Sequence, residues 1–219
     1  MRYKMSLENM LITIGVGIPR TLSIFFFTIT LSLPLGFVVY FMRASKFALI
    51  RVPTRVFISV MRGTPLMLQL LAWYFGPFFL FGMNIRGYRF TALMLAFVLN
   101  YAAYFAEIYR SGFLSIPQGQ YEAAAVLGYS KFQTFFKIVL PQLTKIVLPS
   151  VTNEVITLVK DTSLAYTLAY QEVFSISKLI SASHSTFMPF VIAGTFYYIF
   201  NYLVSYIMER IELRYAYYR

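Results

Sequence analysis

Residues 116–141 read IPQGQYEAAAVLGYSKFQTFFKIVLP and predict a short helix, a turn and a second helix that enters an apolar span. The alanines at 123–125 favour a helix, and their small side chains let another surface approach closely. Gly128 can end that helix in the left-handed conformation. Ser130 and Gln133 have the spacing of a capping box, which predicts where the second helix begins. From these residues alone, an ordinary amphipathic connector between two spans remains open.

Long apolar segments lie on both sides of this loop. A membrane-spanning helix needs about 20 mostly apolar residues. We predict an all-α integral membrane fold in which residues 1–219 form a single transmembrane domain. The fourth of its spans is the weakest, because it contains Asn153, Glu154 and Lys160. The five expected spans cover about 18–42, 60–81, 89–109, 141–160 and 188–209, with a loop at 110–140.

The composition supports a membrane protein and excludes several other classes. The chain is 59% hydrophobic and 12% charged, whereas soluble domains carry roughly 25% charged residues. The net charge of +11 does not indicate nucleic-acid binding, because the Lys and Arg side chains flank the apolar runs. The absence of Cys and the single His exclude a disulfide framework, a thiolate metal site and a multi-histidine metal site within one chain.

The basic residues also indicate an orientation. Cytoplasmic loops of membrane proteins carry an excess of Lys and Arg. Most of the 19 Lys and Arg residues fall on one side if the N-terminus is outside and the C-terminus is cytoplasmic. This orientation puts the 110–140 loop in the cytoplasm.

The central loop resembles the EAA loop of permease subunits of ABC importers. The resemblance lies in Glu122-Ala123-Ala124, in Gly128 six residues after the glutamate, and in Ile138 and Leu140-Pro141. Two further segments resemble the polar amino acid subfamily of these permeases and extend the resemblance from about residue 55 to the C-terminus. They are Arg62-Gly63-Thr64-Pro65 followed by Gln69, and Lys160-Asp161-Thr162-Ser163-Leu164.

The resemblance implies a type I importer permease in a bacterial-type inner membrane. Such a subunit pairs with a second copy or a paralogue, receives a polar or charged amino acid from an extracytoplasmic binding protein, and presents its EAA loop as a coupling helix to a pair of ATP-binding subunits. ATP and Mg are then bound by the partner ATPase, and no cofactor or metal is expected on this chain. Carried over residue by residue, the docking positions are Glu122, Ala123, Ala124 and Gly128.

Polar residues within the spans are candidates for the solute path. Such residues usually face the interior of the helix bundle or a water-filled cavity. Glu154 is the main candidate, with Asn153 beside it, and a structural pair between Glu154 and Lys160 is the alternative. Gln69 and Asn100 are further candidates that interhelical hydrogen bonds explain equally well. Arg62, near the cytoplasmic end of the second span, completes the set.

Two other functions compete with the importer permease. A self-sufficient secondary carrier or channel is one, but such carriers often contain inverted repeats and paired broken helices, and neither is evident in the sequence. An intramembrane enzyme is the other, but the sequence contains no HExxH or GxSxG motif and no Gly-rich phosphate loop. We therefore expect a transport subunit whose ATP hydrolysis lies on another chain.

Overall fold

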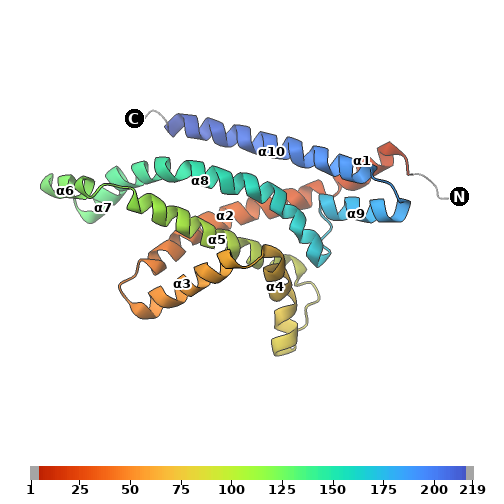
Figure 1. The fold of residues 1–219 in the computed structure, drawn as a ribbon, viewed down its shortest axis with the longest axis horizontal. Helices are drawn as coiled ribbons and strands as arrows, with labels where there is room; N and C mark the ends of the chain where they lie inside the picture. The colour runs from red at the N-terminus through yellow and green to blue at the C-terminus, as the bar shows by residue number, and fades with distance from the viewer. Residues whose placement is uncertain (1–4, 216–219) are drawn as a thin grey trace.

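A computed structural model describes residues 5–215, and no strand occurs among them. The expected all-α class is confirmed. Figure 1 shows the long helices running along the molecule, with α4 projecting away from them. The first half contains α1 (Leu7–Gly15), α2 (Ile18–Arg43), α3 (Ala48–Gly63), α4 (Leu66–Phe81) and α5 (Arg89–Leu114). The second half contains α6 (Gln118–Val126), α7 (Lys131–Thr134), the π-helical turn η1 (Phe135–Val139), α8 (Leu140–Asp161), the 3₁₀ helix η2 (Thr162–Leu168), α9 (Val173–His184) and α10 (Met188–Tyr215).

Within the described residues, four helical segments are long and apolar enough to cross a membrane. A fifth candidate is the pair α3 and α4, which meet at a bend of 115°. The predicted span 60–81 therefore covers the end of α3 and all of α4. Hydropathy cannot detect the bend, because an average over residues does not record the direction of the chain. The described segments that qualify singly are Leu7–Arg43, Arg89–Leu114, Lys131–Leu168 and Met188–Tyr215.

Helix α5 lies at the centre of the bundle. Its alanines at 92, 96, 102, 103 and 106 have no exposed surface, so neighbouring helices approach its backbone closely. The approach is close at Gly36 of α2, where an added Cβ would lie 2.7 Å from Phe105 Cβ and 3.0 Å from Ala102 O. The small residues Ala102 and Ala106 thus form a packing surface for α2.

The two ends of the molecule differ in what they carry. Figure 1 shows α6 and α7 at one end, where α10 also ends, and α9 with α1 at the other. The chain therefore presents its central loop and the end of its last helix on the same side.

Candidate solute cavity and coupling loop

The break between α3 and α4 is built around a proline. Pro65 has no N–H, so Met61 O at the end of α3 loses the donor that a continuous helix would supply. Side-chain amides replace that donor: Gln69 Nε2 and Asn100 Nδ2 each donate to Met61 O at 2.9 Å. Gln69 Nε2 also contacts Thr64 O at 3.1 Å, and its Oε1 accepts from Asn100 Nδ2 at 3.0 Å.

Gln69 and Asn100 therefore stabilise the break between α3 and α4. Both are buried, with 7% and 5% of their surface exposed, and both use their polar atoms on the break. The interhelical hydrogen bonds that the sequence left as an alternative are present for these two residues.

A cavity of about 410 Å³ adjoins this break and lies between α4, α5 and α8. Two carboxylates reach it from α8, Glu154 and Asp161. They are two helical turns apart, so they lie on the same face. Tyr101 Oη donates to Asp161 Oδ2 at 2.8 Å. The lining residues are Thr64, Pro65, Leu66, Asn100, Tyr101, Tyr104, Glu154, Thr157, Asp161 and Leu164.

Four of the five path candidates lie at or beside this cavity. Glu154 and Asn100 line it, and Gln69 braces Asn100. Asn153 is exposed and is not among the lining residues. Among the described ion pairs, none joins Glu154 to Lys160. Asp161 was not among the predicted path residues, although its seven-residue spacing from Glu154 was a usable signal.

Arg62 lies at the edge of the same cavity. Its guanidinium is 5.3 Å from the ring centroid of Tyr104, a lining residue, and 3.6 Å from Glu107 Oε2. Glu107 also contacts Arg43 and accepts from Arg110 Nε at 2.9 Å. Three arginines thus surround one carboxylate near the C-terminal ends of α2, α3 and α5.

The central loop, the candidate for coupling, has the local geometry that the sequence predicts. Gly128 is left-handed, with φ +73°, and Tyr129 N donates back to Ala124 O at 3.0 Å. The capping box is present: Gln133 N donates to Ser130 Oγ, and Ser130 N donates to Gln133 Oε1. The predicted helix, turn and second helix are confirmed.

The predicted docking positions do not all face outward. Glu122, Ala123 and Gly128 are exposed, but Ala124 is completely buried. One side of α6 must pack on its own chain, and α6 contacts η1. The sequence pattern did not reveal which alanine takes that side. The outward apolar residues that it missed are Val126, Leu127 and Phe132, which are 87%, 71% and 71% exposed.

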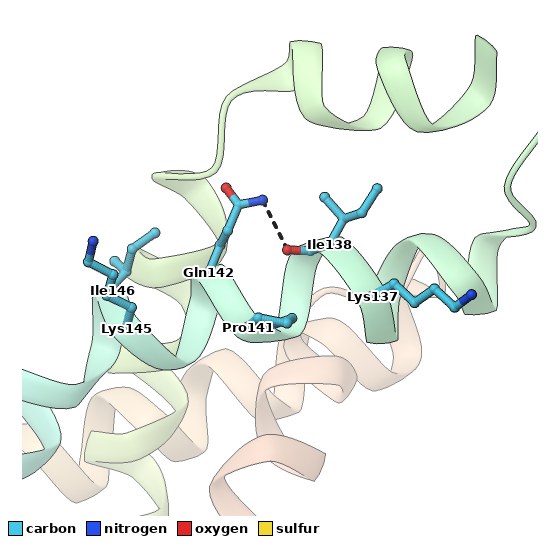
Figure 2. A pocket seen from close by; sticks show the side chains of 6 residues that line it. All are labelled: Lys137, Ile138, Pro141, Gln142, Lys145 and Ile146. Carbon is cyan, nitrogen blue, oxygen red and sulfur yellow. Dashed lines mark hydrogen bonds between the residues drawn. The ribbon is translucent and has the colours of Figure 1, made fainter. Parts of the chain in front are cut away.

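A groove runs beside the loop where α8 begins. Gln142 Nε2 donates to Ile138 O at 3.0 Å and to Gln120 Oε1 of α6 at 3.3 Å. Figure 2 shows Gln142 and Ile138 pointing to the same side, with Lys137 and Lys145 toward opposite ends of the groove. Pro141 lacks the N–H that an α-helix would direct at Lys137 O, and the π-helical turn accommodates this: Leu140 N donates five residues back, to Phe135 O.

A buried carboxylate fixes the opposite end of the molecule. Glu172 caps α9 by accepting from Phe174 N at 2.7 Å and Ser175 N at 2.6 Å, and Tyr197 Oη of α10 donates to it at 2.8 Å. Burial away from water raises the pKa of Glu172 to about 7, against the lowering effect of these donors. Arg20 Nη1 binds Gln171 O at 2.9 Å beside it. The cluster around Glu172 was not among the features predicted from the sequence.

Comparison with known proteins decides the family. The model of the family described as "Binding-protein-dependent transport system inner membrane component" matches residues 32–217. The chain belongs to this family. It is therefore a multi-pass inner membrane component of a transport system, and the prediction of an ABC importer permease is confirmed.

Relatives of this inner membrane component include two bacterial permeases. The octopine transport system permease protein OccM of Rhizobium radiobacter is 38% identical over 210 residues, covering 90% of this chain and 83% of the relative. The probable amino-acid ABC transporter permease protein YckA of Bacillus subtilis is 35% identical over 204 residues, covering 92% and 88%.

A solved structure supports the same family assignment. The crystal structure of an amino acid ABC transporter with histidines matches with a TM-score of 0.85 and 29% identity, over 96% of this chain and 99% of that one. The type I importer permease fold is confirmed, as is the expectation of a transport subunit rather than an enzyme. Nothing in these relationships favours a self-sufficient carrier or channel.

Proposed function

We propose that this permease subunit forms part of the import path for an amino acid, and that its cavity receives the ammonium group of that solute. The observation that carries the proposal is the pair Glu154 and Asp161, because the described residues that line the cavity include two carboxylates and no Lys or Arg. Charged residues within a membrane are costly and usually mark a substrate or ion path. An ammonium ion supplies the opposite charge and three hydrogen-bond donors.

The size of the cavity and the names of the relatives agree with such a solute. Small-molecule sites usually measure about 300–1,000 Å³, and this cavity measures about 410 Å³. Relatives are named for octopine and L-cystine transport, and both solutes are amino acids that carry ammonium groups. A cationic amino acid fits the paired carboxylates best.

The coupling loop is the proposed contact with a pair of ATP-binding subunits, which would hold ATP and Mg. Glu122, Ala123, Val126 and Leu127 give the outer side of α6 a mixed apolar and acidic surface, and Phe132 extends it onto α7. Gly128 reverses the chain between the two helices. Ala124 is reassigned from docking to packing.

Pairing and orientation complete the proposal. A second copy or a paralogue of this chain would complete the path. An N-terminus outside and a C-terminus in the cytoplasm would agree with the distribution of basic residues. They would also agree with the position of α6 and the end of α10 toward the same end of the molecule (Figure 1). An extracytoplasmic binding protein would then deliver the solute near α9.

The test is uptake by the complete transporter in proteoliposomes, with L-arginine delivered by the binding protein. The variant is Glu154→Gln, which removes the charge and keeps the shape. The control is Glu209→Gln on an exposed part of α10. The proposal predicts at least tenfold slower arginine uptake in Glu154→Gln and normal uptake in the control. Equal uptake by the two variants would overturn it.

A further inference from the structure

The charges around the cavity are unevenly distributed. At Glu107, three arginines share one carboxylate: Arg43 and Arg110 make its close contacts, and Arg62 is farther away at 3.6 Å. Among the described residues, no ion pair joins an arginine to either carboxylate of the cavity. Lys160 precedes Asp161 and is itself exposed.

Arg62 lies between these two groups. The Tyr104 ring under its guanidinium is one turn from Glu107 along α5 and lines the cavity. Glu154 lines the same cavity as Tyr104, so the Arg62 guanidinium lies on the cavity's border and faces this carboxylate's side of α5. Because Arg43 and Arg110 also contact Glu107, the Glu107 carboxylate keeps a positively charged partner when Arg62 moves away.

The attachment of Arg62 allows such movement. Its side chain is 42% exposed, against 12% for Glu107, and it lies at the last turn of α3, just before the break. No other hydrogen bond to its guanidinium occurs among the described residues. The backbone beside it is fixed instead, because Gln69 and Asn100 hold Met61 O. A fixed backbone with a loosely held, long side chain lets the charge swing without moving the helices.

We propose that Arg62 is a mobile counter-ion at the inner end of the cavity, shared between Glu107 and Glu154. With Arg62 on Glu107, the cavity is anionic and attracts an ammonium group. When Arg62 turns to Glu154, it competes with that group and promotes its release toward the cytoplasm. Arg62 is thus a positioning residue for transport, and the inference rests on the proposed function of the cavity.

This mechanism predicts opposite effects of Arg62→Met on binding and on turnover. Binding of L-arginine to the purified permease–ATPase complex, measured without the binding protein, should tighten about fivefold, the change expected from losing one partly exposed charge pair. Turnover in proteoliposomes with saturating loaded binding protein should fall. Arg62→Lys keeps the charge and should recover most of the turnover. Arg55→Met, on an exposed part of the same helix, is the matched control and should change neither quantity.

Making Arg62→Met in the Glu154→Gln variant tests the counter-ion role separately from the proposed function of the cavity, on which that role rests. In Glu154→Gln, the Arg62→Met change should no longer tighten binding, because the competition is gone. If Glu154→Gln weakens arginine binding but Arg62→Met changes binding and turnover in the same direction, or changes neither, the counter-ion role is wrong and the cavity assignment stands. If neither the wild type nor Glu154→Gln binds arginine, both are overturned.

Discussion

Replacing Gly36 with alanine tests whether the α2–α5 contact sets the stability of the bundle. The added Cβ would lie 2.7 Å from Phe105 Cβ, 3.0 Å from Ala102 O and 3.3 Å from Ala106 N. Carbon atoms in ordinary contact are about 3.5–4.0 Å apart, so the Cβ is close to 1 Å too near. Its neighbours are a Cβ and backbone atoms, which cannot rotate away.

The expected magnitude follows from two opposing contributions. Overpacking of a close helix contact costs about 1–3 kcal/mol, and replacing glycine by alanine within a helix returns up to about 1 kcal/mol. We therefore expect a net loss of about 1–2 kcal/mol. In a chain of this size, such a loss lowers the melting temperature by about 2–8 °C.

The assay is thermal unfolding of the detergent-purified chain, followed by loss of the monodisperse peak in size-exclusion chromatography. The matched control is Gly194→Ala in α10, where an added Cβ meets nothing within 4 Å. It should leave the melting temperature unchanged or raise it. If Gly36→Ala is as stable as Gly194→Ala, the close approach of α2 to α5 is wrong.

Two further substitutions test the cap at Glu172 and the helix break held by Gln69. The pKa of Glu172 is raised to about 7, above the ordinary value of about 4.3 for a glutamate. The folded state therefore binds the proton more tightly than the unfolded state, and the stability of the protein falls as the pH rises through about 4.5–7. Glu172→Gln should remove this part of the pH dependence of the melting temperature, and an unchanged pH profile would contradict the prediction. Gln69→Leu leaves the Met61 carbonyl with only the Asn100 donor. We expect the free energy of unfolding to fall by about 1–3 kcal/mol because of the unsatisfied groups. The melting temperature should be lower than that of the control Leu68→Ala, on the exposed face of α4.

Much of the fold could be predicted from residues whose effects are local. The uncharged runs indicate helices because lipid leaves few alternatives for the backbone. Gly128, Ser130 and Gln133 fix the loop because each satisfies backbone groups within four residues of itself. These signals do not depend on what packs around them.

The parts that were missed depend on distant residues. The bend at Thr64-Pro65 lies within the predicted second span, and hydropathy did not indicate it. A usable signal was present, because a proline disfavours the helical conformation of the residue before it. Thr64 is indeed extended, at φ −120° and ψ 147°. Ala124 is buried in a helix that contacts η1, and the cap at Glu172 includes Tyr197, 25 residues away. Asp161 is bonded to Tyr101 of α5, 60 residues away along the chain.

The central claim is that this chain couples to an ATPase through the outer side of α6. It is tested most directly by purifying the tagged chain from its native membrane in mild detergent and identifying its partners by mass spectrometry. Val126→Asp places a charge on the proposed contact, and Ala182→Asp places the same charge on an exposed part of α9 at the opposite end. The account predicts an ATP-binding subunit with the parent chain and with Ala182→Asp, and its loss from Val126→Asp. An ATPase that stays bound to Val126→Asp, or none with the parent chain, would contradict it.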